Sequence, residues 1–433
     1  MTTTATPAPR FDLDIAAVPR PVRAQALLDT MAQRVVVADG AMGTMLPEHD
    51  PSLEDYQQLE GCNEILNVSR PDIIAAVHDA YYEVGVDAVE TNTFGANWSN
   101  LYDYEIEDRI TELAREGARI ARGRAEHWEA QDGRMRWVLG SMGPGTKLPS
   151  LGHTTYANLR ATFAEQAVGL IDGGADAFLV ETSQDLLQTK AAINGCKQAI
   201  VERGVRLPIF VEVTVETTGT MLMGSEIGAA LTALEPLGVD AIGLNCATGP
   251  AEMSEHLRQL SVRSRVPVIC MPNAGLPVLG KNGAEYPLGP EELATAHEQF
   301  VREFGLSLVG GCCGTTPAHL GAVVRRLGGA AAVTRTPQPE AGVASLYQHV
   351  PFDQDASYLA IGERTNANGS KAFREAMLEG NWDECVQIAR NQIRVGAHLL
   401  DVCVDYVGRD GVADVREIVS RFASASTLPL VID

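Results

Sequence analysis

The chain has 433 residues, of which 45% are hydrophobic and 21% are charged, and its formal net charge is −22. This is the composition of a globular protein with room for more than one domain. An acidic chain repels phosphate, which makes nucleic acid and anionic membranes poor partners. No apolar run reaches the roughly 18 residues of a membrane-spanning helix, so the sequence predicts no membrane partner.

Residues 1–32 are predicted to form a tail and a lead-in. The first 24 residues are rich in Thr, Ala and Pro, without the apolar core of a signal peptide or the basic bias of a transit peptide. The chain also has eight cysteines. Without an export signal, they indicate a reducing, cytoplasmic location, where cysteines act as metal ligands, catalytic groups or small buried residues.

Between residues 33 and 327, short apolar runs alternate with longer amphipathic stretches. Most of the runs are continuously apolar, as is typical of parallel strands buried on both faces. They are Val35–Ala38, Val86–Val89, Trp137–Gly140, Ala177–Val180, Ile209–Val213, Ala241–Leu244, Val268–Met271 and Leu306–Val309. Eight strand–helix units predict an α/β fold, a (β/α)8 TIM barrel, with an open doubly wound sheet as the alternative. In a barrel, the polar residues that follow these strands surround one mouth, where active sites lie.

Residues 328–350 have the composition of an inter-domain linker, with glycines and alanines followed by Thr, Pro and Gln. A second domain is predicted over 351–433. Its strands are expected at Tyr358–Gly362, Leu399–Val404 and Leu430–Ile432, with helices between them. Three strands cannot close a barrel, so we expect this second β/α barrel to be truncated.

Two adjacent cysteines, Cys312 and Cys313, stand between glycines in the segment Gly310–Gly314. Adjacent side chains of a regular strand point to opposite faces, so both can face one metal only if the backbone leaves β geometry. We attribute that freedom to the flanking glycines, which reach positive φ without steric cost. Cys246 follows the sixth predicted strand, and its carboxyl end converges on the same mouth of a barrel.

Three sulfur ligands with an open fourth position match a catalytic zinc site. Zinc keeps a coordinated thiol deprotonated near neutral pH, where a free thiol is mostly protonated. The alternatives are a redox disulfide between Cys312 and Cys313, or an inert buried pair. The other five cysteines are predicted to be small buried residues, and Cys270 is the least certain because it lies near a strand end. They are Cys62, Cys196, Cys270, Cys385 and Cys403.

Five segments carry a family resemblance. They are Asp39–Thr44 (DGAMGT), Glu90–Gly95 (ETNTFG), Glu181-Thr182 with Asp185, Gly243–Cys246 (GLNC) and Gly310–Gly314 (GGCCG). They resemble the homocysteine-binding domain of the cobalamin-dependent methionine synthase family. The resemblance implies that Cys246, Cys312 and Cys313 are catalytic zinc ligands and that the substrate thiol is homocysteine. Betaine–homocysteine and related S-methyltransferases share this domain, so it leaves the methyl donor open.

The second domain bears on the donor. Ile361–Asn366 (IGERTN), Asp401–Asp405 and Leu430–Asp433 resemble the start of the family's folate-binding, pterin-type barrel. This resemblance implies methyltetrahydrofolate as the methyl source and methylcobalamin, on a cobalamin-binding domain or protein, as the carrier. It also implies that Asp433 binds the pterin ring, because a carboxylate accepts two hydrogen bonds there. Asn366 and Glu363 are further cofactor-binding candidates.

The resemblance implies that carboxylates bind the homocysteine ammonium, with Asp39 and Glu181 as first candidates and Asp185 as a further one. Asp39 also suits a turn before Gly40, and Glu181 also suits a buried acid bonded to backbone. Asn245 is a candidate substrate-binding residue that would orient the site, and it equally suits a structural role in which it satisfies loop backbone. The backbone N–H groups of the glycine-rich loops after the first and eighth strands suit the substrate carboxylate.

Three functions fit these features. The first is zinc-dependent activation of homocysteine for methylation to methionine, with methyltetrahydrofolate as the donor through cobalamin. The second is a methyltransferase that uses a betaine or sulfonium donor directly. The third is a non-catalytic module that binds zinc and homocysteine.

Overall fold

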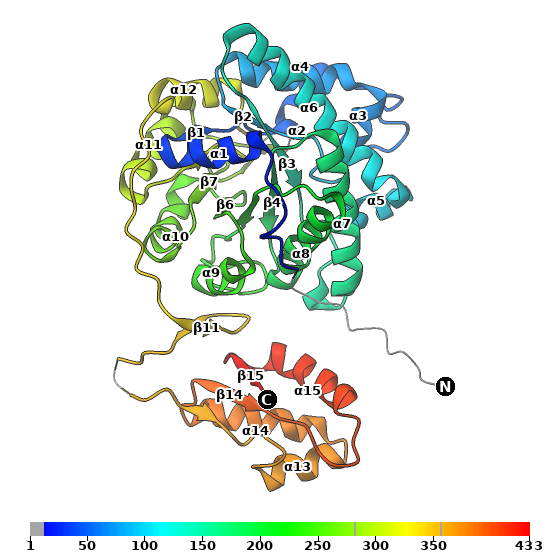
Figure 1. Cartoon of the computed structure of the whole chain (residues 1–433), viewed down its shortest axis with the longest axis vertical. Helices are drawn as coiled ribbons and strands as arrows, with labels where there is room; N and C mark the ends of the chain where they lie inside the picture. Colours follow the sequence, from blue (N-terminus) through cyan, green and yellow to red (C-terminus); the bar gives the residue numbers. More distant parts are fainter. Residues whose placement is uncertain (1–12, 281–282, 356) are drawn as a thin grey trace. The chain divides into compact units, whose positions relative to one another are not determined.

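The computed structural model describes residues 13–280, 283–355 and 357–433 (Figure 1). Residues 1–12 of the predicted tail lie outside the described residues. The chain forms two compact units. Unit 1 covers Met1–Gly219 and Leu234–Pro337, and unit 2 covers Thr220–Ala233 and Gln338–Asp433.

Unit 1 is built on an eight-stranded parallel sheet in the order β1-β10-β7-β6-β5-β4-β3-β2. Its strands are β1 (Val36–Val37), β2 (Ala88–Glu90), β3 (Trp137–Met142), β4 (Ala177–Ser183), β5 (Ile209–Val213), β6 (Ala241–Asn245), β7 (Val268–Met271) and β10 (Leu308–Val309). A parallel bridge between Ala38 and Ala88 joins β1 to β2, and Asp87 N donates to Val37 O at 2.7 Å. The two ends of the sheet therefore meet, which confirms the predicted barrel and excludes the open sheet.

Helices surround this barrel (Figure 1). They are α1 (Val22–Gln33), α2 (Met42–Met45), α3 (Leu66–Ser69), α4 (Pro71–Glu83), α5 (Trp98–Asp103), α6 (Ile110–Asp132), α7 (Tyr156–Gly173), α8 (Leu186–Arg203), α10 (Pro250–Arg263), α11 (Pro290–Phe304) and α12 (Pro317–Leu327). The helix ends follow the local sequence. Proline opens α4, α10, α11 and α12, where its missing N–H costs nothing. Left-handed glycines directly follow α6, α7, α8 and α11.

The barrel core includes a helix that the sequence analysis did not predict. Leu27 and Met31 of α1 belong to the same buried cluster as Trp137 and Phe210, which point into the barrel. Alternate residues of each strand supply the rest of that cluster, as the two-residue period of a strand requires. Trp137 is the first residue of β3, so the helix α1, which packs against it, covers the amino ends of the strands. The carboxyl ends stay uncovered by α1.

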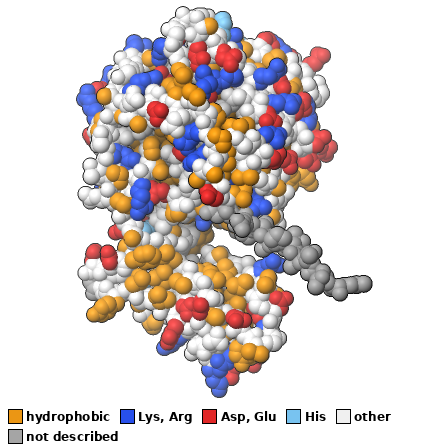
Figure 2. All heavy atoms as spheres, viewed as in Figure 1, with side chains coloured by type: hydrophobic (Ala, Val, Ile, Leu, Met, Phe, Trp, Pro, Cys, Tyr) orange, Lys and Arg blue, Asp and Glu red, His pale blue; other side chains and the backbone are white. Residues whose placement is uncertain are grey.

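Unit 2 has a three-stranded parallel sheet of β13 (Ile361–Gly362), β14 (Leu399–Val402) and β15 (Leu430–Ile432). The helices α13 (Lys371–Leu378), α14 (Trp382–Arg394) and α15 (Gly411–Ala425) accompany it. This smaller parallel sheet has the strands and helices that the sequence predicted for the second domain. Figure 2 shows hydrophobic side chains gathered on the surface of unit 2, where Val395 and Val407 are 82% and 95% exposed.

The stretch predicted as a linker, 328–350, contains regular structure. An antiparallel pair, β11 (Gly342–Ala344) and β12 (His349–Pro351), lies at its end. Within unit 2 this hairpin binds the segment before and within α9 (Ile227–Leu234). Glu226 N donates to Tyr347 O at 2.8 Å, and Thr232 Oγ1 lies 2.8 Å from His349 Nδ1. Composition alone did not reveal these contacts, because they join residues more than a hundred positions apart.

None of the described helices combines the length and the apolar character that crossing a membrane requires.

The position of α1 leads to a stability prediction. Leu27 is fully buried, whereas Val22 of the same helix is 83% exposed. We expect Leu27→Ala to lower the free energy of unfolding of unit 1 by about 2–5 kcal/mol, because it leaves a cavity in the barrel core. Val22→Ala is the control and should change it by less than about 0.5 kcal/mol. Urea unfolding followed by tryptophan fluorescence measures both, and equal effects would show that α1 does not close the barrel.

Candidate metal and substrate site

Three cysteine sulfurs meet at the carboxyl ends of β6 and β10. Cys246 directly follows β6, while Cys312 and Cys313 follow β10. In the sheet, β7 alone lies between these two strands. The three Sγ atoms lie within 4.8 Å of one another, with Cys246 Sγ 3.9 Å from Cys313 Sγ. The fold thus brings together three soft donors that are far apart in the sequence.

The backbone at two places in this cluster adopts the left-handed region. Cys246 has φ 59° and Ala247 has φ 56°, although neither is glycine. Such residues cost of order 1–3 kcal/mol each and persist only where the surrounding structure holds them. On the other side, Gly314 has φ 78°. The chain therefore leaves β geometry after both strands, and the sulfurs turn toward one another.

The role expected of the glycines is right for Gly314 and wrong for Gly310 and Gly311, which keep ordinary φ. At Gly310 and Gly311 glycine is required for another reason, because the neighbouring atoms leave no room for a side chain. A Cβ on Gly311 would lie 2.5 Å from Thr315 Oγ1, and one on Gly40 would lie 2.4 Å from the same atom. Thr315 thus fills the space between the two glycine-rich loops.

Hydrogen bonds tie the cysteine loop to the loops after β7 and β1. Cys312 N donates to Pro272 O at 2.8 Å, and Gly311 N donates to Asp39 O at 2.9 Å. Thr315 Oγ1 donates to Cys312 O at 2.6 Å. Because its backbone is bonded on three sides, the loop presents its sulfurs in a preformed arrangement.

The thiols of the cluster differ in their affinity for protons. The pKa of Cys313 is lowered to about 3, because the Cys246 and Cys312 thiols donate hydrogen bonds to its sulfur. The pKa of Cys312 is raised well above its usual value by the hydrogen bonds it gives to Cys246 and Cys313 and by burial. The cluster therefore holds at least one thiolate at neutral pH, which is the form that binds metal.

A cavity of about 340 Å³ opens next to these sulfurs. It is lined by Ala41, Met42, Gly43, Thr44, Asn63, Glu64, Glu90, Thr91, Asn92, Phe94, Ser141, Glu181, Thr182, Cys246, Tyr286, Gly311, Cys312 and Cys313. No Lys, Arg or His is among these residues. The cavity thus combines sulfur donors with carboxyl groups and carries no positive side chain.

Two carboxyl groups lie side by side in this wall. Glu181 Oε1 accepts from Ser141 Oγ, and its Oε2 accepts from Asn245 Nδ2 at 3.1 Å. Glu90 lines the same cavity, close enough for the charge of Glu181 to act on it. Burial raises the pKa of Glu181 to about 7, and burial together with the Glu181 charge raises the pKa of Glu90. Such a pair favours a ligand that brings its own positive charge. Glu90 was not among the predicted site residues, although the ETNTFG segment that contains it was one of the recognised motifs.

The other two predicted ammonium ligands lie differently. Asp39 is 1% exposed and stands behind the cavity wall, where its Oδ1 accepts from Glu90 N at 2.9 Å. Asp185 lies outside the cavity lining. Its carboxylate caps α8 through Leu187 N and also accepts from Ser150 N and Oγ. Asp39 therefore supports Glu90, and Asp185 is occupied by a structural role.

Asn245 connects the acids to the cysteine loop. Its Oδ1 accepts from Thr182 N at 2.7 Å, and its Nδ2 lies 3.9 Å from Cys312 Sγ, besides donating to Glu181. Thr182 has φ 54°, a third left-handed non-glycine residue at this mouth. The single amide thus links the end of β4 to the cysteine cluster, and its bond from Thr182 N satisfies loop backbone.

The five other cysteines are buried, as predicted. Cys270 packs its sulfur against Met253 and stays outside the cluster.

In unit 2 the predicted pterin-binding residues follow the carboxyl ends of the parallel strands. Asp433 is exposed directly after β15, and Glu363 is exposed directly after β13. Asn366 donates to Asp401 Oδ2 at 2.9 Å and its own Oδ1 caps the turn at Asn368. These residues share one edge of the sheet.

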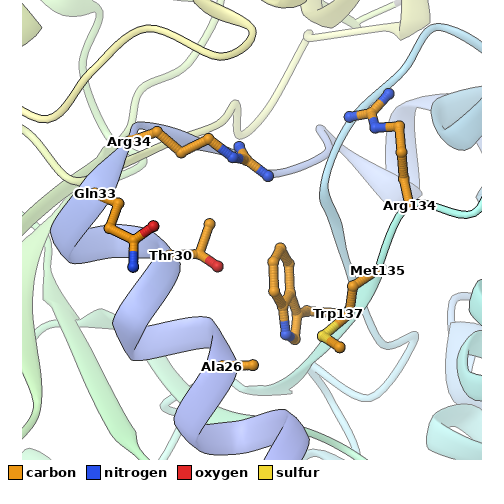
Figure 3. Close-up of a pocket in the computed structure, with 7 residues that line it drawn as sticks. All are labelled: Ala26, Thr30, Gln33, Arg34, Arg134, Met135 and Trp137. Carbon is orange, nitrogen blue, oxygen red and sulfur yellow. The ribbon is translucent and has the colours of Figure 1, made fainter.

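A second cavity, of about 660 Å³, lies at the amino ends of the strands. Figure 3 shows Ala26, Thr30 and Gln33 of α1 on one side, and Arg134, Met135 and Trp137 on the other. Arg34 and Arg134 both bind the carboxylate of Asp87. Its lining residues include no Cys, His, Asp or Glu, so we place the candidate site at the opposite mouth.

One further acid lies inside the barrel. Glu212 of β5 is fully buried, and neither of its carboxyl oxygens has a hydrogen-bond partner among the described residues. Burial, followed by the charge of Glu181, raises its pKa well above the usual value. Burial without a hydrogen-bond partner thus favours the protonated form of Glu212.

The sequence of unit 1 matches a known family. Residues 36–327 match the family model described as homocysteine S-methyltransferase. The chain belongs to this family of methyltransferases. Residues 362–433 match the model described as pterin binding enzyme.

Curated relatives include the methionine synthases of Mycobacterium tuberculosis and Mycobacterium leprae, which are 62% and 60% identical over 94% of this chain. The alignment covers 34% of each relative, so the chain spans about a third of their length. Among solved structures, the metallated form of the homocysteine methyltransferase MmuM from Escherichia coli has a TM-score of 0.57. It is 23% identical and covers 70% of this chain and 99% of its own, a likeness that shows the shared fold.

Glu212 leads to a prediction about pH. Its folded-state pKa is raised, so its contribution to stability is complete below the ordinary glutamate pKa and is lost as the pH rises toward the folded value. Above about pH 5, ionisation of Glu212 should lower the unfolding free energy of the wild type by up to about 1.4 kcal/mol per pH unit, and we expect Glu212→Gln to remove this part of the fall.

The matched control for this prediction is Glu54→Gln at an exposed position. Denaturant unfolding at several pH values gives the slopes. If Glu212→Gln and the wild type have parallel pH profiles, Glu212 is already ionised in the folded protein.

Proposed function

We propose that this chain binds a zinc ion and homocysteine and prepares the homocysteine thiol for methylation to methionine. The observation that carries the proposal is the meeting of three cysteine sulfurs and an acid pair around one cavity. Membership of the homocysteine S-methyltransferase family supports it. The zinc barrel is assigned to residues 33–327.

The donor set fits zinc. Three sulfurs within 4.8 Å of one another suit a soft or borderline cation, and Cys313 is already a thiolate. Three protein ligands leave a position for substrate, the layout of a catalytic site. When bound, zinc keeps the substrate thiol deprotonated near neutral pH. Cys246, Cys312 and Cys313 would hold it.

The chain's own residues bind and orient the amino acid part of the substrate. Glu181 and Glu90 receive the ammonium, which supplies the positive charge that this wall lacks. Met42 and Gly43, in the first turn of α2, offer backbone N–H groups to the carboxylate. Asn245 holds Glu181 at a set place relative to Cys312, so ammonium and thiol are recognised together.

The methyl donor is proposed from unit 2, with the folate domain at residues 351–433. The pterin-binding match and the two methionine synthase relatives support methyltetrahydrofolate as the source and cobalamin, on a partner domain or protein, as the carrier. Asp433, Asn366 and Glu363 are the proposed pterin contacts. The free cysteines of the described chain fit a reducing, cytoplasmic location.

A metal measurement tests the three sulfurs. The purified chain should contain about one zinc ion, and Cys312→Ser should lose most of it, because two thiolates hold zinc far less tightly than three. Cys196→Ala, which alters a buried cysteine outside the cluster, should keep the zinc. Full zinc content in a Cys246, Cys312 and Cys313 triple variant would sink the proposal. Methyl transfer assayed with methylcobalamin, a betaine and a sulfonium donor identifies the donor.

A substrate comparison tests the acid pair. At about pH 8, Glu181→Gln should weaken homocysteine binding about 10- to 100-fold, the value of a hydrogen bond between charged groups. Binding of 4-mercaptobutanoate, which has the thiol and carboxylate but no ammonium, should be unchanged by the same substitution. Titration calorimetry of zinc-loaded protein measures both. Equal losses of affinity for the two ligands would mean that Glu181 supports the fold and does not bind the ammonium group.

A further inference from the structure

Tyr286 is an aromatic residue at the metal cluster that the cysteine motifs do not include. It lies between β9 (Gly283–Glu285) and α11, in the connection that follows β7. Its side chain lines the cavity together with the three cysteines, and burial and the nearby Cys313 raise the pKa of its phenol. A phenol keeps its proton at neutral pH and a cysteine that binds a metal is a thiolate, so between these two groups the O–H is the donor.

The position of this ring is built into the fold. Gly314, the residue after Cys313, has φ 78°, and a Cβ placed there would lie 2.2 Å from Tyr286 Cγ. The ring therefore occupies the space that the absent side chain leaves. A glycine at 314 serves both the turn and the approach of the tyrosine.

The segment that carries Tyr286 is anchored to the same backbone as Cys313. Ala274 N donates to Cys313 O at 3.0 Å, and Leu288 N donates to Ala274 O at 2.9 Å. His319 Nε2 lies 2.9 Å from Leu288 O. One residue, Ala274, thus links the cysteine loop to the tyrosine segment, so phenol and sulfur keep their separation.

We propose that Tyr286 is a positioning residue for the metal: its O–H orients the Cys313 thiolate and withdraws part of its charge. This inference rests on the proposed metal site. Three thiolates around a divalent cation leave one excess negative charge, and a neutral donor offsets it without adding a positive group that would repel the metal. Residues that hydrogen-bond to metal ligands commonly change metal affinity 10- to 100-fold when they are lost.

The test uses Co²⁺ as a probe, because its sulfur-to-metal charge-transfer absorption reports the electron density on the thiolates. In Tyr286→Phe, we expect about 10-fold weaker Co²⁺ binding in competition with a chelator. We also expect the charge-transfer band to move to lower energy, because a thiolate without its donor gives up electron density more readily. Tyr104→Phe is the matched control, since its hydroxyl donates to Glu60 O in another loop.

A second variant approaches the same contact from the other side. Gly314→Ala should displace the ring, and adding Tyr286→Phe to it should cause little further loss, because both changes remove one hydrogen bond. If Tyr286→Phe alone leaves the Co²⁺ affinity and the energy of the charge-transfer band unchanged, the inference is overturned, whatever the effect of Gly314→Ala. A wild-type chain that binds no Co²⁺ would instead overturn the metal site itself.

Discussion

The site depends on holding three sulfurs within 4.8 Å of one another, an arrangement in which three thiolates would repel one another without a cation. Without a cation, thiols at this separation share protons unequally, as the lowered pKa of Cys313 shows. The protein maintains this arrangement through backbone bonds from the loops after β1 and β7, and through left-handed φ values at Cys246 and Ala247. Strain of this kind is stable only in a rigid setting, and a closed barrel with its amino end covered by α1 provides one.

A second electrostatic constraint lies beside the first. Glu90, Glu181 and Asp39 are close together, Glu212 lies within the same barrel, and no basic side chain lines the cavity. Burial raises the pKa values of these acids, and a cation bound beside them would favour their charged forms. Sulfur donors suited to a divalent metal and acids suited to an ammonium thus share one space. Sulfur donors beside carboxyl groups fit an amino acid that carries a thiol. The residues that line the cavity therefore support the proposed substrate, as does the family.

The position of Tyr286 shows how loops refine a barrel site. The strands place the cysteines, whereas the connection after β7 brings a neutral donor to one of them. Gly314 makes that approach possible by leaving room for the ring. The same mouth therefore combines residues from the ends of β1, β2, β3, β4, β6 and β10 with Asn63, Glu64 and Tyr286 from longer connections. Such sharing is common where rigid strands support variable loops.

The eight strands could be predicted from the sequence alone, because buried parallel strands are continuous apolar runs. Such runs can be recognised without knowing which strands pair with each other. The sequence also determined the three cysteines, since their motif and the barrel topology bring them to one mouth. Only the tertiary structure shows that Glu90 lines the cavity with Asp39 behind it, and that the Asp185 side chain caps α8. It also shows that Thr315 leaves no room for a side chain on Gly311. It also decided the places of α1, Tyr286 and the hairpin within 328–350. Each of these features depends on contacts between residues that are distant in the sequence, and local sequence patterns do not specify those contacts.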